Sequence, residues 1–414
     1  MSTTEGSKRL GGISDAFSDR NFRIYSVGSI GSWISFFVQI VTVSWLTWEL
    51  TGSTKWLAIM ALLDIVPNVV LMPIAGAISD RFDRHKIMLV TSILLFLQAA
   101  LLALVAWADM LTIWTLAVLV LMHGIFISLM VPAMYGIIPR FVGRAVMPSA
   151  IAVASAYSQL ALFVGPALAG WIIAEHGTTV AFVVNALGYL LLICAFLRMR
   201  TPADYVPPER STRSFVGDIW DGAIYIFERK TIWSLLLIML VADAVALGFI
   251  HMLPAYADTV LGLGVVGMTT ILAMRGLGAI CAALRLAYLG APAARVNSVL
   301  WAFLAALLAL GVLVQTRNLY LAAGIAVVMG FAGETKNTGI MTIIQLAVDE
   351  NQRGRVMGTA FMFSQLAAGI GAYLIGAFSV EAGVQLPTTV AVCVGLGFWG
   401  FIFLQRKKLF QDRF

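Results

Sequence analysis

Several ionisable and polar side chains lie inside long apolar stretches of this sequence. A charge at the centre of a lipid bilayer costs at least ~2.5–3.5 kcal/mol on insertion scales, so such a group usually faces a partner or an aqueous cavity. Loss of water also favours the protonated form of a carboxyl group, which suits a carrier of protons. The groups of this kind are Asp64, Asn68, His123, Asp243, His251, Arg275, Glu334 and Lys336.

Two interpretations of the charges in the second half of the chain are open. They could form structural salt bridges, for example Lys336 with Asp243 or Glu334 with Arg275, or at least one carboxylate could act on a substrate or a proton. Glu334 and Lys336 are two residues apart, so on a helix they point about 200° away from each other and cannot pair. We therefore expect one of them to face a cavity and the other to face a neighbouring helix.

The surroundings of Asp64 and His251 give weaker indications. Pro67 and Pro73 distort the stretch around Asp64, so a cavity position and a packing position are both open for its side chain. His251 lies near the outer end of its stretch, and we expect an interfacial residue there rather than a proton relay.

The composition determines which elements must position these residues. The chain has 414 residues, of which 60% are hydrophobic and 12% charged, and its mean hydropathy is +0.93. Soluble domains contain about 25% charged residues, so a multidomain soluble enzyme is excluded. A nucleic-acid binder is excluded too, although the net charge is +6, because the charges lie between apolar blocks. The three cysteines lie inside apolar runs, so we expect no disulfide framework, no metal site and no cofactor.

The hydropathy pattern predicts an all-α polytopic membrane protein with twelve spans. A helix needs about 20 mostly apolar residues to cross the hydrocarbon core. The first apolar run follows a polar segment without a cleavage site, so we expect it to be a retained span. The predicted spans are 22–48, 55–79, 87–107, 111–137, 149–174, 178–197, 231–254, 265–289, 297–315, 319–346, 357–380 and 385–404.

The basic residues predict the orientation of these spans. With both termini in the cytoplasm, all but four of the 27 Lys and Arg residues fall on the cytoplasmic side. Lys55 and Arg317 face outward, and Arg275 and Lys336 lie within spans. The basic excess therefore reports topology rather than recognition of a ligand.

An internal repeat divides the chain into two parallel halves. The segment 158–161 recurs at 364–367, and nine of the twenty pairs aligned at this offset of 206 are identical between 158 and 177. Such repeats are common in secondary transporters. The predicted organisation is a cytoplasmic segment 1–21, a six-helix half 22–197, a cytoplasmic linker 198–230, a second six-helix half 231–404 and a tail 405–414.

The loop between the second and third spans carries a recognisable motif. Its residues Gly76, Asp80, Arg81, Arg84 and Lys86 resemble the G-x-x-x-D-R-x-x-R-[RK] signature of the major facilitator superfamily. A glycine permits close helix approach, and an aspartate can face a helix N-terminus. The two arginines can then pair with carboxylates and carbonyl ends across the seam between the halves.

Other segments narrow the resemblance. Gly165, Pro166 and Gly170 are similar to the Gly-Pro antiporter motif of exporters, and 349–356 is similar to a segment of the enterobactin-exporter-like branch. Two features depart from the pattern. The stretch around His123 lacks the arginine of some proton-coupled drug exporters, and the second copy of the loop signature, at 285–295, lacks its aspartate.

This resemblance implies a secondary transporter that works by alternating access, and not an enzyme. It implies proton-driven export of a siderophore, drug or other amphipathic molecule by a monomer in the bacterial inner membrane. An uptake symporter or lipid flippase on the same fold is the alternative. The superfamily lines its cavity with the first, fourth, seventh and tenth spans, so we expect Glu334 to contribute more to activity than Asp64. No phosphate-binding loop of an ATP-driven pump and no motif of an intramembrane protease or hydrolase occurs.

Overall fold

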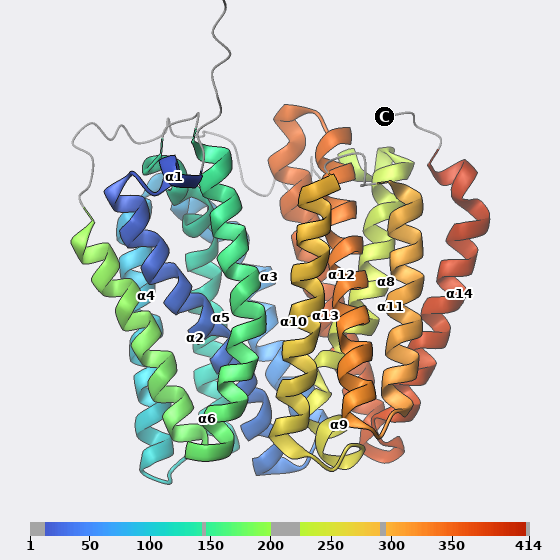
Figure 1. The fold of residues 1–414 in the computed structure, drawn as a ribbon, viewed down its shortest axis with the longest axis horizontal. Coiled ribbons are helices and arrows are strands. Elements are labelled where there is room, and N and C mark those ends of the chain that lie inside the picture. Colours follow the sequence, from blue (N-terminus) through green and yellow to red (C-terminus); the bar gives the residue numbers. More distant parts are fainter. Residues whose placement is uncertain (1–12, 143–145, 200–223, 290–294, 411–414) are drawn as a thin grey trace, which may run out of the picture.

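The computed structural model describes residues 13–142, 146–199, 224–289 and 295–410, and these are almost entirely helical (Figure 1). A single turn, α1 (Ile13–Ala16), precedes the long helices. The first half contains α2 (Arg20–Thr51), α3 (Thr54–Arg81), α4 (Arg84–Trp107), α5 (Ile113–Ile137), the short 3-10 helix η1 (Ile138–Arg140) and α6 (Met147–Arg198). The second half contains α8 (Lys230–His251), α9 (Leu253–Thr259), α10 (Gly264–Leu289), α11 (Val296–Gln315), α12 (Leu319–Ala347), α13 (Glu350–Ala382) and α14 (Gln385–Leu409).

The helices make twelve crossings, as the hydropathy pattern predicts. Eleven helices of the described residues are long and apolar enough to span a membrane. One of them, α6, has 52 residues and is interrupted at Gly177, where φ is 80° and ψ is 174°. Because glycine tolerates this backbone conformation at little cost, the chain reverses there and α6 supplies two crossings (Figure 1).

The predicted span 231–254 requires a correction. Helix α8 ends at His251, and Met252 leaves the helical conformation before α9 starts at Leu253. Pro254 stands in the first turn of α9, where its missing N–H is tolerated. The hydropathy of 231–254 is continuous, so hydropathy alone does not reveal this break.

Local capping chemistry ends the helices at short turns. Asp19 accepts a hydrogen bond from the Phe22 amide at the start of α2, and Gly52 closes α2 with a φ of 56°. Thr112 and Thr115 form a capping box at the start of α5. Helix α1 and the described end of α14 lie at the same end of the bundle, which we call the terminal end (Figure 1). The opposite end, with the turns near residues 52, 110, 177, 262, 317 and 383, is the far end.

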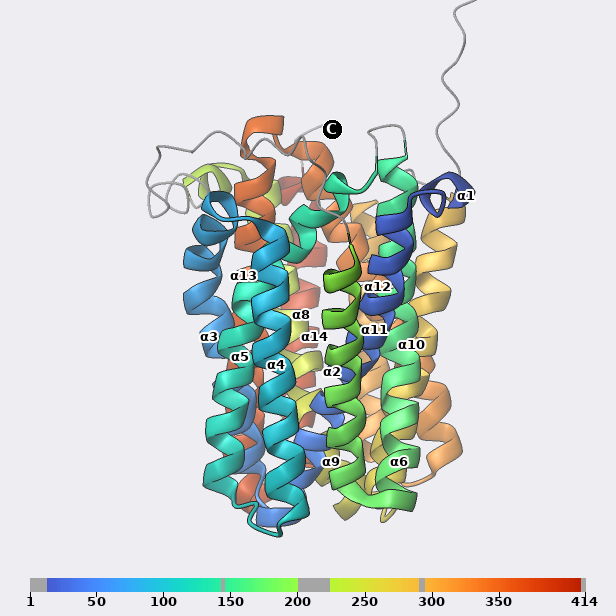
Figure 2. The same cartoon turned by 90° about the vertical axis from the view of Figure 1, so that its left-hand side faces the viewer.

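The two halves repeat the same packing. The first helix of each half lies along the fifth, which pairs α2 with α6 and α8 with α13, and the second packs against the fourth, which pairs α3 with α5 and α10 with α12. Gly165 and Gly371, which are separated by the repeat offset of 206 residues, allow the first helix of each half to lie close to the fifth. A Cβ atom on Gly165 would meet Phe37, and one on Gly371 would lie 2.6 Å from the carbonyl carbon of Ala244. Figure 2 views the bundle from the side of the first half.

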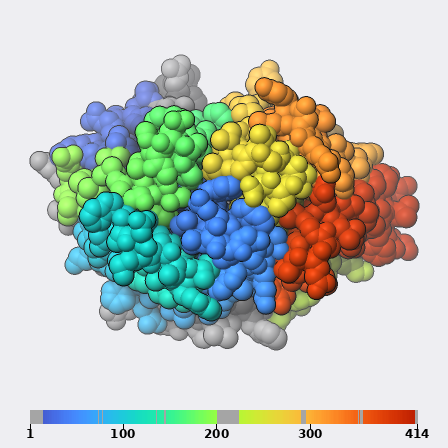
Figure 3. All heavy atoms as spheres, turned by 90° about the horizontal axis from the view of Figure 1, so that it is seen from below, coloured from blue at the N-terminus to red at the C-terminus, as the bar shows by residue number. Residues whose placement is uncertain are grey.

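The halves meet through α6 against α10 and α3 against α13. Two side-chain hydrogen bonds between described residues join them at the far end. Trp48 Nε1 donates to Asp258 Oδ2 over 3.0 Å, and Thr54 Oγ1 donates to the Gly376 carbonyl over 2.9 Å. A Cβ atom on Gly376 would lie only 2.8 Å from Ala58 Cβ. The halves are therefore closely packed at the far end, where Figure 3 shows their atoms in contact.

Parts of the predicted organisation lie outside the described residues. These parts are 1–12, 200–223 of the linker and 411–414 of the tail. Residues 224–228, the end of the linker, are helical. Tyr225 reaches the second half there, because its hydroxyl donates to Asp349 Oδ2 over 3.1 Å and Arg229 lies 3.6 Å from the same carboxylate.

Candidate functional site

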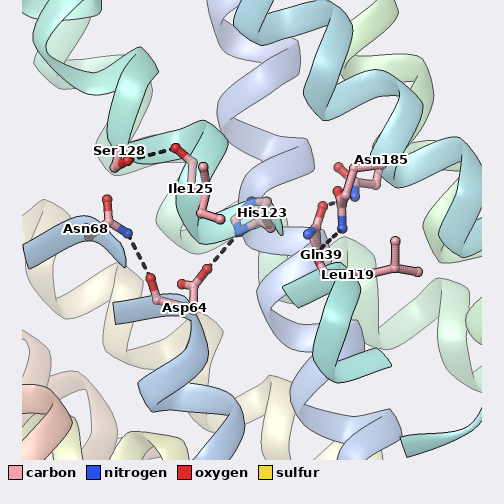
Figure 4. Close-up of polar contacts among 9 residues, drawn as sticks. Gln39, Asp64, Asn68, Leu119, His123, Ile125, Ser128 and Asn185 are labelled. Carbon is pink, nitrogen blue, oxygen red and sulfur yellow. Dashed lines mark hydrogen bonds and ion pairs between the residues drawn. The ribbon is translucent and has the colours of Figure 1, made fainter. Parts of the chain in front are cut away.

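The first half holds a carboxylate–imidazole pair. His123 Nδ1 of α5 lies 2.8 Å from Asp64 Oδ1 of α3 (Figure 4). The His123 side chain is 4% exposed and the Asp64 side chain 30%, so the carboxylate is the more accessible partner. The Nε2 atom of His123 is buried, and no protein atom in the described part of the chain forms a hydrogen bond with it.

The local sequence explains how this pair forms. A Cβ atom on Gly124 would lie 2.6 Å from the Asp64 carbonyl, so the absence of a side chain lets α5 approach α3 closely. Asn68 Nδ2 donates to the same carbonyl over 3.1 Å, next to the position where Pro67 lacks an N–H (Figure 4). The sequence left both a cavity position and a packing position open for Asp64. Both apply, because its backbone packs against α5 and its carboxylate lines a cavity.

This cavity is walled by α2, α3 and α5, and α8 of the second half reaches it. Gln39, Asp64, His123 and His251 are its principal polar lining residues. Gln39 also accepts a hydrogen bond from Asn185 of α6, and the Phe36 ring stacks on His123 with centroids 5.9 Å apart. The cavity therefore combines one carboxylate with two imidazoles.

The second half holds a buried ion pair. Lys336 Nζ of α12 lies 2.5 Å from Asp243 Oδ1 of α8, and both side chains are less than 5% exposed. Ser364 of α13 donates to the other carboxylate oxygen over 2.5 Å. We call Asp243, Lys336 and Ser364 the clamp, because they join three helices. Of the two salt bridges considered from the sequence, this one is present.

Arg275 and Glu334 lie on the cavity beside the clamp. Both line it together with Asn337, and Thr338 donates to Glu334 Oε1 over 2.6 Å. The Arg275–Glu334 ion pair considered from the sequence does not form, although the two charges act on each other electrostatically. Lys336 of the clamp lines the same cavity as Glu334, so the expectation that only one of Glu334 and Lys336 faces a cavity is wrong, although Lys336 does also reach α8 through the clamp.

The two sites occupy equivalent helices with the charges exchanged. Asp64 is on the second helix of its half and His123 on the fourth, 59 residues apart. Arg275 and Glu334 are on the second and fourth helices of the other half, also 59 residues apart. The acid and the base are in hydrogen-bonding contact in the first half, whereas Arg275 and Glu334 of the second half form no ion pair.

The loop motif at the terminal end makes contacts that differ in part from those expected. Arg84 donates to the Gly136 carbonyl at the end of α5 over 2.9 Å. It thus meets a helix end, as expected, here in its own half, and the contacts expected across the seam stay a prediction. Arg81 and Lys86 are exposed, Gly76 is half-buried, and the side chain of Asp80 lies outside the described part of the structure.

Asp83 is a further ion-pairing residue of this loop that the signature did not reveal. It caps α4 by accepting from the His85 amide and pairs with Arg140 at 2.5 Å. Partial burial alone would raise the pKa of Asp83, but the hydrogen bonds from Arg140 and His85 outweigh burial and lower it. The pair therefore persists at neutral pH and is lost only as pH falls through this lowered pKa.

The Gly-Pro motif lies at the contact between the halves. Pro166 stands inside α6, and Gly165 seats this helix on α2. A Cβ atom on Gly170 would lie 2.6 Å from Thr269 Cβ of α10. No group of three potential metal ligands occurs in the described segments.

A bundle of twelve crossings in two repeated halves, with charges buried around internal cavities, defines a membrane transporter of the major facilitator type. Residues 14–410 match the family of transmembrane secretion effectors, and the chain belongs to this family.

Individual relatives agree with this assignment. The chain is 24% identical over 410 residues to the uncharacterized MFS-type transporter YfiS of Bacillus subtilis, covering 94% of this chain and 92% of the relative. It is 25% identical over 361 residues to the multidrug efflux pump Tap of Mycolicibacterium fortuitum, covering 84% and 86%. Its fold matches a crystal structure of a bacterial homolog of the human lysosomal transporter Spinster, in an inward-facing and unoccupied conformation. The TM-score is 0.75 at 16% identity, with 95% of this chain and 98% of the other covered.

Proposed function

We propose that this transporter exports an amphipathic small molecule, such as a drug or siderophore, in exchange for protons. The observation that carries the proposal is that two carboxylates, Asp64 and Glu334, line internal cavities without a fixed cation in hydrogen-bonding contact. Each can change its protonation state without breaking a hydrogen-bonded ion pair to a lysine or arginine, and Arg275 acts on Glu334 only across the cavity. Asp243 differs, because loss of its charge would leave Lys336 uncompensated.

The orientation in the proposal follows from the basic residues. They concentrate in the segments of the terminal end, which the positive-inside rule assigns to the cytoplasm. The far end then faces outward, and its packed contacts correspond to a state open toward the cytoplasm. Protons would enter from the far end and leave at the terminal end while the substrate moves the other way.

The loop motif acts as a gate in this proposal. Arg84 holds the end of α5, and the Asp83–Arg140 pair joins α4 to the segment that precedes α6. Asp80 stands at the last turn of α3, so its charge can favour one state of the rocking halves. We expect Asp80→Asn to impair transport while protein level and membrane insertion stay nearly intact. Normal transport by the purified variant would contradict this gating role.

The direction of transport is supported by likeness to exporters. The relative from Mycolicibacterium is an efflux pump, and the Gly-Pro motif resembles that of exporters. We take proton-driven export as the function and treat uptake on the same fold as an outcome of the experiment.

Everted membrane vesicles test the proposal. They would be energised by respiration and given ethidium as a cationic amphiphile and 2,3-dihydroxybenzoylserine as a catecholate. We expect at least one probe to accumulate in vesicles containing the protein, and nigericin, which collapses the pH gradient, to abolish this accumulation. Accumulation that survives nigericin would contradict proton coupling. Accumulation only in right-side-out vesicles would contradict export.

A further inference from the structure

Arg275 lines the cavity beside the clamp, and the protein makes no contact with its charged group. It lies on α10, and the cavity continues between α8, α11 and α12. Within the described residues, no hydrogen bond or ion pair is formed by its guanidinium group. A guanidinium carries five N–H donors in a planar fork that matches a carboxylate or a phosphate. A charge at membrane depth without a partner in the protein points to a ligand that supplies one.

The backbone around Arg275 is held in place by two neighbouring helices. A Cβ atom on Gly276 would lie 2.8 Å from the Leu162 carbonyl of α6, and one on Gly330 of α12 would meet the Arg275 carbonyl. Arg275 thus stands where the two halves touch, and Leu162 of the first half lines the same cavity. The guanidinium group is therefore presented to the cavity from a fixed backbone, which lowers the cost of ordering it around a ligand.

Hydrogen-bond acceptors of α12 lie on the same cavity. Glu334 Oε1 accepts from Thr338, and the other carboxylate oxygen accepts nothing from the described residues. Asn337 lies three residues further and so on the same face of the helix, and its buried Oδ1 atom has no donor in the described part of the chain. A Cβ atom on Gly333 would meet nothing within 4 Å, so the space beside Glu334 is open. These acceptors suit a group with several N–H donors, such as an ammonium group.

The charges around this cavity cancel in pairs. Asp243 and Lys336 neutralise each other in the clamp, whereas Arg275 and Glu334 attract each other across the cavity without forming an ion pair. A ligand with only a negative or only a positive group would add a net charge to this low-dielectric site, which is costly. A ligand with both groups adds no net charge and gives each of the two separated residues an opposite charge.

We propose that this cavity binds a zwitterionic head group of the transported molecule, with its carboxylate or phosphate on Arg275 and its ammonium group on Glu334. The inference rests on the proposed transport of an amphipathic small molecule and names the class of that molecule. Phe303 and Leu310 of α11 and Met329 of α12 line the rest of the cavity. They provide an apolar wall for the apolar part of the same molecule.

Four ligands with one apolar body test this charge requirement. The dipeptide leucylphenylalanine is a zwitterion, its C-terminal amide is a cation, its N-acetyl form is an anion, and the form blocked at both ends is neutral. The flexible backbone lets the separation of the two charges adapt to the site. Binding would be measured by isothermal titration calorimetry on the purified protein in a non-ionic detergent at about pH 6.5, where both ends of the dipeptide are charged. We expect the zwitterion to bind at least about tenfold more tightly than each of the other three, as loss of one charged hydrogen-bonding contact implies.

Two variants assign the contacts to residues. Arg275→Gln should weaken binding of the zwitterion and the anion at least about tenfold, and should not weaken binding of the cation. Glu334→Gln should weaken binding of the zwitterion and the cation, and should not weaken binding of the anion. Arg285→Gln is the matched control, because Arg285 is exposed on the same helix and its Cζ atom lies 5.9 Å from the centre of the Phe331 ring. It should retain all four affinities. Equal weakening of all four ligands by Arg275→Gln would contradict the assignment of the negative group to Arg275.

Thermal unfolding without ligand distinguishes a ligand-binding arginine from a structural one. Removal of a charge that forms no ion pair breaks no pair in the protein, so we expect Arg275→Gln to unfold at the wild-type temperature or above it. A clear fall in the unfolding temperature would mean that Arg275 is the structural counter-charge of Glu334, and would overturn the inference. The comparison of the four ligands on the wild type needs no variant.

A zwitterionic head group can belong to a free solute or to a lipid, and a competitor separates the two. Lysophosphatidylethanolamine carries a phosphate and an ammonium group. Displacement of the dipeptide by this lipid would assign the site to a lipid head group, and lack of displacement would assign it to a free solute. Equal affinities of the four ligands, or binding of neither zwitterion, would overturn the inference. Binding needs no pH gradient, so the expected pattern in a protein whose accumulation survives nigericin would reject the proposed proton coupling and not this site.

Discussion

The first half of the transporter pairs a partly exposed aspartate with a histidine, whereas the second half pairs a buried aspartate with a lysine. Asp64 contacts His123 at 2.8 Å and is partly exposed, while Asp243 contacts Lys336 at 2.5 Å and is buried. An imidazole changes its charge near neutral pH, whereas removing the charge of one partner of a buried lysine–carboxylate pair leaves the other partner uncompensated. The comparison teaches that two repeated halves can bury charge in different ways, with a partly exposed carboxylate–imidazole pair in one and a buried clamp in the other.

The second half keeps a titratable acid as well, but outside its clamp. Glu334 is held by a hydroxyl, not by a cation, and Arg275 lies on the same cavity without contacting it. In the proposed mechanism, the fixed pair preserves the packing of α8, α12 and α13 while Glu334 changes its charge. The first half has no such division, because Asp64 is at once packed and exposed.

The largest expected effect comes from breaking the clamp. Asp243→Asn leaves Lys336 buried without a counter-charge, and loss of one partner of a buried ion pair costs about 3–5 kcal/mol of stability. We expect a large fall in the thermal unfolding midpoint in detergent, and a much smaller fall for Asp64→Asn, whose partner can become neutral. The double variant Asp243→Leu with Lys336→Met should recover most of the loss. Equal falls for Asp243→Asn and Asp64→Asn would remove the distinction between the two halves.

The second effect compares the two titratable acids. We expect Glu334→Gln to lower proton-driven transport at least about 100-fold, the lower end of what a positioned proton-transfer group contributes, while the protein stays folded. Asp64→Asn should lower transport less, because Glu334 lies on α12, the tenth crossing, which the family resemblance implies is cavity-lining. Transport flux and thermal stability, measured on both variants, distinguish loss of a proton-transferring group from loss of folded protein. A fully active Glu334→Gln beside an inactive Asp64→Asn would place the main site in the first half.

A third variant makes the first half resemble the second. His123→Lys replaces the titratable partner of Asp64 by a fixed cation, so protonation of the site no longer responds to pH near neutrality. We expect the transport rate to lose part of its pH dependence, by about threefold across pH 6–8, while membrane insertion is retained. His176→Lys, on the exposed far end, is the control. An unchanged pH profile of His123→Lys would show that the Asp64 pair does not titrate during transport.

The smallest effect uses a serine at the same position of each repeat. Ser364 donates to Asp243, whereas Ser158 at the repeat offset donates to the Ser155 carbonyl of its own helix. We expect Ser364→Ala to lower stability by about 1 kcal/mol, because hydrogen bonds between membrane helices contribute about this much. Ser158→Ala should have almost no effect. If Ser364→Ala and Ser158→Ala lowered the thermal unfolding midpoint equally, the assignment of Ser364 to the clamp would be wrong.

Most of the fold could be predicted from the sequence, because bilayer thickness fixes the length of an apolar helix. The twelve predicted spans correspond to the observed crossings, including the reversal near Gly177 within α6. The break after His251 was missed, since Leu253 and its neighbours remain apolar on both sides of it.

The candidate site was predictable only in its residue types. The cost of a charge in the membrane identified the charged groups. The two-residue spacing of Glu334 and Lys336 did not predict that both side chains line the same cavity. Which residues of different helices meet depends on tertiary packing. The contact of Asp64 with His123 and the approach of His251 from the other half therefore could not be read from spacing. The recurrence of Ser158 as Ser364 in the repeat was the sequence signal that could have identified Ser364, because the residues around Ser364 do not single it out.

Proton movement during transport tests the central claim most directly. The purified protein would be reconstituted with a pH-sensitive dye inside the vesicles, and ethidium or the catecholate would be added as a gradient. We predict proton movement opposite to the probe for the wild type, and none for the double variant Asp64→Asn with Glu334→Gln at retained folding. Equal proton movement in the double variant and the wild type would contradict the assignment of proton coupling to these two carboxylates.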